Sequence, residues 1–143
     1  MRPRSETMIL DGRTLILVAD GRKARLFQEA RLGGPLTEHP EWVAAMTAGP
    51  VGGVHDHTAH AARRDQAATD FLTGLARHIS QVFSHHGFDQ LILIAAPRAL
   101  GVLRRHLPEG LKQRLVLSEP HDRVSAGLAD IQQAVRALRR INA

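Results

Sequence analysis

The sequence has no cysteine and no tyrosine, and only one tryptophan and four phenylalanines among its 143 residues. The absence of cysteine excludes disulfide bonds, thiolate nucleophiles and cysteine-ligated metal sites. Because aromatic rings are so few, the core must consist mainly of Leu, Ile, Val and Ala. The same scarcity argues against an aromatic platform that stacks RNA bases.

Long apolar runs are missing as well. Asp11, Gly12 and Arg13 interrupt the first apolar stretch, so we expect no signal peptide. No run approaches the roughly 20 apolar residues of a membrane span, and we expect a cytoplasmic protein. The length suits one domain with its own core, so we expect an N-terminal arm over 1–13 and a single domain over 14–143.

The basic residues are unevenly distributed. The formal net charge is +5, and residues 97–143 hold nine Arg or Lys against four Asp or Glu. A basic face suits phosphate-bearing partners, RNA above all. The alternative is the solvated surface of an Arg-rich protein.

The first half of the chain shows strand patterns. Residues 14–19 are aliphatic and β-branched, Asp20-Gly21 is a turn signal, and residues 24–29 alternate between apolar and polar. This predicts an antiparallel hairpin. In the following segment, 36–46, Pro40 favours an edge strand with an irregular tail.

Residues 47–64 are rich in Gly, small residues and His and have no apolar period, which predicts a long loop. Asp65 is the expected N-cap of a helix that Gly87 ends. The apolar stripe of this helix comprises Phe71, Leu72, Leu75, Ile79, Val82 and Phe83.

The second half alternates strands with helices. Residues 91–95 form a buried strand that Pro97 must end, and Pro97 also suits the first turn of a helix striped by leucines. After a connector at 108–113, residues 115–117 predict a short strand and residues 124–142 a helix capped by Ser125. The expected stripe of that helix is Leu128, Ile131, Val135 and Leu138.

The succession of elements predicts an α/β fold. A strand–helix–strand order requires parallel strands joined by right-handed crossovers. We therefore expect a single mixed β-sheet, an antiparallel hairpin plus parallel βαβ strands, covered by about three helices.

Ligands of such sheets usually bind beyond the carboxyl ends of the parallel strands. There the loops 20–23, 96–98 and 119–122 would converge. Arg98 at a helix start, with Arg22 nearby, suits a phosphate group, although Arg98 is otherwise simply a solvated end-of-strand residue. The predicted phosphate or RNA contacts are Arg22, Lys23, Arg98, Arg104 and Arg105.

Three other kinds of chemistry have weaker support in the sequence. In an extended loop, His55, His57 and His60 could bind a metal ion, although loops also collect histidine by chance. An RNase-H-like nuclease needs several convergent carboxylates, and only Asp20 and Asp122 are candidates. No serine lies in a nucleophile elbow. We expect no cofactor and no catalytic residue.

The segments TLILVADGRKARLF and FDQLILIAAPRALGVLRRHL, with the Gly-rich loop between them, resemble the bacterial host attachment protein family. Its members show a strand–Asp/Asn-Gly–Ala-Arg opening and a later Ala-Pro-Pro-Arg-x-Leu-Gly-x-Leu-Arg segment. Residues 95–104 match that segment, except that Ala96 replaces the first proline. The resemblance covers roughly residues 14–122, and the His-rich loop departs from the family pattern.

This resemblance implies a fold similar to the middle domain of archaeal and eukaryotic class-1 release factors, which is RNase-H-like. Those factors carry a Gly-Gly-Gln loop before a long helix, where this chain has Gly52 and Gly53 followed by Val54, with Arg63 and Arg64 behind them. Because Val54 replaces the glutamine, peptidyl-tRNA hydrolysis does not carry over. Asp20, Gly52, Gly53, Arg63 and Arg64 define a possible loop site.

The leading hypothesis is a non-catalytic module that associates with RNA or the ribosome. The alternative is a protein-interaction or surface-adaptation protein in attachment to host cells, with a homodimer left open. A metal-dependent hydrolase comes third. No membrane span is expected, and no sequence-specific DNA-binding motif is present.

Overall fold

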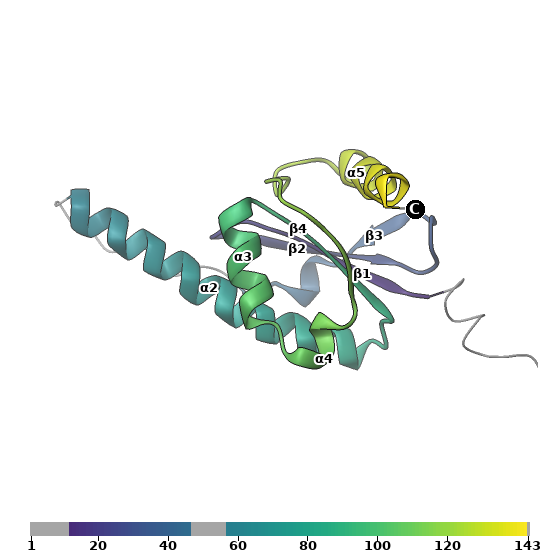
Figure 1. Ribbon diagram of the computed structural model, residues 1–143, viewed down its shortest axis with the longest axis horizontal. Helices are drawn as coiled ribbons and strands as arrows, with labels where there is room; N and C mark the ends of the chain where they lie inside the picture. Colours follow the sequence, from purple (N-terminus) through teal and green to yellow (C-terminus); the bar gives the residue numbers. More distant parts are fainter. Residues whose placement is uncertain (1–11, 47–56, 143) are drawn as a thin grey trace, which may run out of the picture.

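The computed structural model of the protein describes residues 12–46 and 57–142 (Figure 1). A five-stranded sheet forms its centre, with the strand order β3-β2-β1-β4-β5. The strands are β1 (Thr14–Ala19), β2 (Ala24–Glu29), β3 (Leu36–Glu38), β4 (Gln90–Ala95) and β5 (Leu115–Glu119). The helices are η1 (Pro40–Trp42, a 3-10 helix), α2 (His57–His85), α3 (Pro97–His106), α4 (Glu109–Lys112) and α5 (Leu128–Ile141).

The sheet is mixed, as predicted. β1 pairs antiparallel with β2, and β2 with the short β3, whereas β1, β4 and β5 run parallel. The hairpin, the edge position of β3 and the α/β class are confirmed. The likeness to a release-factor domain stays a prediction.

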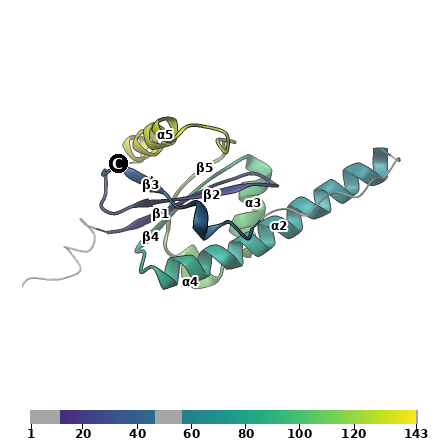
Figure 2. The ribbon, with the colours of Figure 1, turned by 180° about the vertical axis from the view of Figure 1, so that it is seen from behind.

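Alternate residues of the central strands face two separate apolar layers. In β4, Leu91, Leu93 and Ala95 pack with α2 and α3, whereas Ile92 and Ile94 pack with α5. Figures 1 and 2 show α2, α3 and α4 on one face of the sheet and α5 on the other. Strands β1 and β4 read as unbroken apolar runs because both of their faces are covered.

Helix α2 begins earlier than predicted. It starts at His57, so the expected loop over 57–64 is wrong, and Asp65 lies inside the helix rather than at its cap. Its first turns project beyond the body of the protein (Figures 1 and 2), and Phe71 is the first buried residue from Ala62 onwards. A projecting helix buries no face and shows no apolar period, while the alanines and arginines before Asp65 are good helix formers. The predicted stripe from Phe71 to Phe83 is buried, and Gly87 follows the helix with φ +68°.

Helix α5 starts later than predicted. The segment before it forms a turn in which the N–H of Ala126 donates to the carbonyl of Arg123. Gly127, not Ser125, is the N-cap, and Leu128 is 42% exposed because it lies in the first turn. The buried stripe is Ile131, Ala134, Val135 and Leu138. The predicted connector at 108–113 contains the short α4.

Within 12–46 and 57–142, no helix is both long and apolar enough to cross a bilayer. Helix α2 has the necessary length, but its sequence contains many polar and charged residues.

Candidate binding edge of the sheet

Three loops converge at one edge of the sheet, as predicted, because β1, β4 and β5 are parallel neighbours. The first loop is a tight turn held by Asp20. One carboxylate oxygen of Asp20 accepts the N–H groups of Arg22 at 2.7 Å and Lys23 at 2.6 Å. The side chains of Arg22 and Lys23 are exposed. Asp20 is therefore used to shape the turn that presents two cations.

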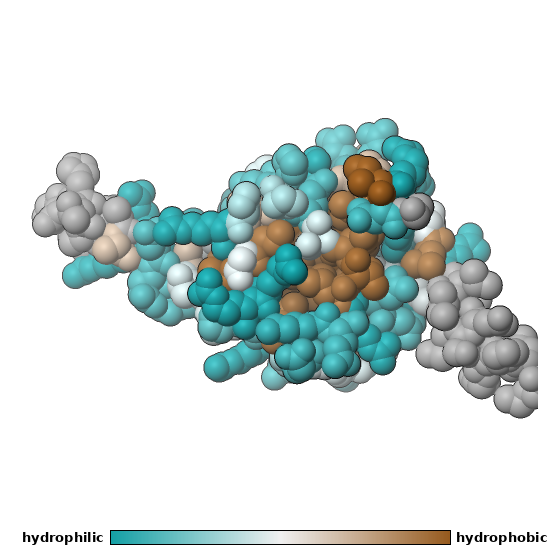
Figure 3. Space-filling model, in the orientation of Figure 1, coloured by the Kyte–Doolittle hydropathy of each residue, from teal (hydrophilic) through white to brown (hydrophobic). Residues whose placement is uncertain are grey.

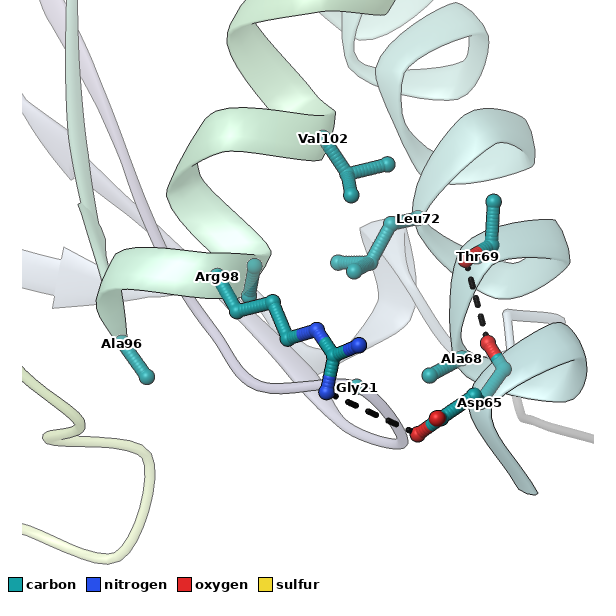
Figure 4. Close-up of a pocket in the computed structure, with 9 residues that line it drawn as sticks. Gly21, Asp65, Ala68, Thr69, Leu72, Ala96, Arg98 and Val102 are labelled. Atoms are coloured by element: carbon teal, nitrogen blue, oxygen red, sulfur yellow. Dashed lines mark hydrogen bonds and ion pairs between the residues drawn. The ribbon is translucent and has the colours of Figure 1, made fainter. Parts of the chain in front are cut away.

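A cavity of about 190 Å³ opens between this turn, α2 and α3 (Figure 4). Its walls are mostly apolar, and its charged groups are Arg98 and Asp65. The lining residues are Gly21, Asp65, Ala68, Thr69, Leu72, Ala96, Arg98, Ala99 and Val102. Helix α2 thus supplies one wall of the cavity, and this could not be deduced from the order of the strands. We call this end of the sheet, with the loops 20–23, 96–98 and 119–122, the cavity edge.

Gly21 allows the turn to pack directly against α2. A Cβ atom at this position would lie 2.9 Å from the Cβ of Ala68, closer than two carbon atoms can approach. The Asp-Gly pair, predicted as a turn from φ preferences, is therefore also required for close packing.

Arg98 lies in the first turn of α3, next to Asp65 of α2 (Figure 4). The two charged groups are 3.7 Å apart, and their side chains are 84% and 64% exposed. An ion pair this open to water contributes little to stability. The guanidinium of Arg98 is therefore available to a ligand, although Asp65 competes for it.

The other predicted cations divide into two groups. Arg63 and Arg64 are exposed on α2 just before Asp65, which lines the cavity. Arg104 and Arg105 lie in the last turn of α3, about 10 Å along the helix from Arg98. The predicted single phosphate surface is thus two surfaces.

The third loop contributes little free charge. The Glu119 carboxylate accepts a hydrogen bond from Arg123, and this bond raises the pKa of the Arg123 guanidinium. The Asp122 carboxylate accepts the N–H of Val124 at 3.2 Å. Asp20 and Asp122, the two candidate nuclease acids, are both engaged by backbone groups.

The histidine prediction changes with the start of α2. His57 and His60 lie on the helix, so the extended loop that was to place them together is wrong for this part. His55, Gly52 and Gly53 lie outside the described residues. In the described part of the chain, no group of three or more His, Asp or Glu side chains could hold a metal ion.

A cluster of rings lies near the opposite edge of the sheet. Trp42 is stacked between His39, at 3.8 Å between ring centroids, and His86, at 4.3 Å. Phe88 meets the edge of Trp42 at 5.7 Å, and a ring nitrogen of His78 hydrogen-bonds the Trp42 carbonyl. Burial lowers the pKa of His86, and neighbouring positive charges add to the effect. The cluster ties η1 to the end of α2.

A family model described as "Protein required for attachment to host cells" matches residues 15–135. The match runs from β1 into α5 and therefore includes the whole sheet and the cavity edge. No curated protein matches the chain.

Proposed function

The chain belongs to the family of proteins required for attachment to host cells, and we propose that it is a cytoplasmic, non-catalytic module that binds RNA at the cavity edge of its sheet. The observation that carries the proposal is the charge around this edge. Five exposed cations lie on the β1–β2 turn, α2 and α3, and each lines the cavity or lies within two residues of one that does. They are Arg22, Lys23, Arg63, Arg64 and Arg98.

The carboxylates at this edge keep their negative charge, but most of them do not contact these cations. Asp20 and Asp122 each accept backbone N–H groups of their own loops, and among the described residues Asp65 is the carboxylate that pairs with one of the five cations. A phosphodiester backbone is a polyanion that such a surface attracts without reading sequence. The few aromatic rings favour phosphate contacts over base stacking.

The affinity should depend on salt in a predictable way. If Arg22, Lys23 and Arg98 each neutralise one phosphate, log Kobs for single-stranded RNA falls with log salt at a slope of about −2. Raising salt from 50 to 200 mM then weakens binding roughly 20-fold. Filter binding of an unstructured 20-nucleotide RNA across this range measures both quantities.

Substitutions at the edge make the test specific. Arg98→Gln should weaken binding and reduce the slope by about 0.7, because one phosphate contact is lost. Asp65→Asn should strengthen binding, because it frees Arg98 from its competing carboxylate. Arg136→Gln, an exposed site on α5, is the matched control and should change neither quantity. Absence of RNA binding at 50 mM salt, or equal losses from Arg98→Gln and Arg136→Gln, would refute the proposal.

Sedimentation tests whether the RNA that the protein binds is ribosomal. Protein that associates with ribosomes should co-sediment with them from a cell lysate at low salt, and the Arg98→Gln variant should remain closer to the top of the gradient. If the protein binds free RNA but does not co-sediment, the ribosomal form of the proposal is wrong.

Protein interaction in attachment to host cells is a second candidate function, favoured by an apolar surface. Figure 3 shows hydrophobic residues gathered between α4 and α5, where β5 forms the edge of the sheet. Val116 of β5 is 45% exposed. Complementing a gene-deletion strain with the Val116→Asp variant tests this function. Loss of attachment with RNA binding retained would favour it over the RNA proposal.

A further inference from the structure

The outer strands of the sheet, β3 and β5, are not equivalent. β3 has three residues, and Gln132 of α5 accepts the backbone N–H of Leu36 at 3.5 Å. β5 has five residues, and no described strand pairs with its outer side. An edge strand turns alternate N–H and C=O groups outward, where another chain can pair with them. β5 is therefore the edge that can accept a partner.

One side of β5 is bordered by cations. Arg104, Arg105 and Lys112 line a groove of about 350 Å³ together with Leu115, the first residue of the strand. Arg114, which precedes β5, is exposed as well. These side chains come from the end of α3, from α4 and from the start of β5, so the fold gathers them at one place.

The α5 side of β5 offers several apolar groups. A second groove of about 270 Å³ runs along residues 115–118, from Arg104 of α3 to Asn142 at the end of α5, and its lining is mixed. Leu117 packs with the α5 layer, and Val116 is 45% exposed. Ile141, next to Asn142, is 80% exposed. Side chains that face α5 from a docked strand would thus meet apolar groups.

A second copy of the chain fits this edge poorly. The β5 strand of a second copy would offer these cations one carboxylate, Glu119, which Arg123 already holds. The register of β5 against β4 also shifts at Val116, which has no partner residue in β4. Two paired copies would have to accommodate two such bulges, whereas a peptide strand meets one.

We propose that the outer edge of β5 binds an extended peptide in which acidic and apolar residues alternate, as a sixth strand of the sheet. Alternate side chains of a strand point to opposite faces, so the acidic ones reach Arg104, Arg105 and Lys112 while the apolar ones lie towards α5. Backbone hydrogen bonds supply affinity, and the two grooves supply specificity. The proposal is independent of RNA binding at the cavity edge.

Fluorescence anisotropy with the full-length protein tests this. The probe is a fluorescein-labelled, C-terminally amidated octapeptide of alternating Val and Glu. The comparison peptide has four Glu followed by four Val, and so has the same composition and charge. We expect saturable binding of the alternating peptide, at least tenfold tighter than the comparison peptide, and slower amide exchange in β5 when it is bound.

Two charge-reversal substitutions test whether the peptide binds at the basic groove beside β5. Arg105→Glu should weaken peptide binding about tenfold or more, whereas Arg136→Glu, the control on α5, should leave it unchanged. Both residues are exposed, and circular dichroism confirms that each variant is folded. Equal binding of the two peptides, or equal effects of the two substitutions, would overturn the proposal.

Two other occupants are outcomes of the same experiment. A protein that sediments as a dimer, and becomes monomeric in the Val116→Asp variant, has a second copy on β5, and the peptide proposal is then wrong. If the protein binds RNA but no peptide, and Arg105→Glu abolishes the RNA binding, the groove is a phosphate site. This result also overturns the peptide proposal. If the RNA experiments with Arg98→Gln refute RNA binding at the cavity edge, the peptide proposal is unaffected.

Discussion

Replacing Arg139 by methionine should destabilise the protein strongly, because it leaves a buried carboxylate without its positively charged partner. Glu29, at the end of β2, is 1% exposed, and its carboxylate accepts a hydrogen bond from Arg139 of α5 at 2.5 Å. The N–H of Gly33 donates to the same oxygen at 3.2 Å. The other Glu29 oxygen is buried without a described partner. Arg139 is thus the only described positive charge paired with this carboxylate.

The magnitude follows from the cost of an uncompensated buried charge. Removing one partner of a buried ion pair costs about 3–5 kcal/mol. A chain of this size has a total stability of about 5–15 kcal/mol, so Arg139→Met should lose a third or more of it. The double variant Glu29→Met/Arg139→Met removes both charges and should lie within about 1 kcal/mol of the unmodified protein, or above it.

Urea denaturation at pH 7 measures these differences, and a constant m-value shows that each variant unfolds over the same surface. Arg136→Met, on the exposed side of the same helix, is the control and should change stability by less than about 0.5 kcal/mol. A loss of under 1 kcal/mol for Arg139→Met would refute the reasoning. So would a double variant as unstable as the single one, because the loss would then come from packing alone.

Two further predictions concern the ends of the sheet. Gly21→Val places a Cβ 2.9 Å from that of Ala68, and we expect a loss of about 1–3 kcal/mol in urea denaturation. Ala68→Gly should restore part of it, and no restoration would place the strain elsewhere. Because burial lowers the pKa of His86, its proton favours the unfolded chain, so stability should fall as pH drops from about 6.5 towards the lower folded-state pKa. Trp42 fluorescence follows this unfolding, and His86→Phe should flatten the pH dependence; an unchanged slope would exclude His86 as its source.

The sheet could be predicted from the sequence because its signals are local. β1 and β4 are short aliphatic runs, buried on both faces, with turn residues or proline at their ends. Pro97 both stops β4 and begins α3, as expected. The parallel order then placed the three loops at one edge. These features depend on residues that are neighbours in the chain.

The helix ends and the walls of the site could not be predicted in this way. The first turns of α2 project beyond the sheet (Figure 1) and show no apolar period, so the sequence predicted a loop there. α5 starts late because Arg25 of β2 donates to the carbonyls of Val124 and Ala126, which holds that segment as a turn. Asp65 and Ala68 reach the cavity only because α2 crosses the edge of the sheet. These are tertiary contacts, and no local pattern encodes them.

Part of the basic character of residues 97–143 is structural, and this changes where an RNA surface must be sought. Arg123 and Arg139 are held by Glu119 and Glu29. Arg104 and Arg105 lie at the carboxyl end of α3, where positive charge offsets the partial negative charge of the helix terminus. Of the predicted contacts in this third, only Arg98 stands at the cavity edge. RNA bound there must draw its other cations from the turn after β1 and from α2, so the overall excess of charge in the C-terminal third does not measure RNA affinity.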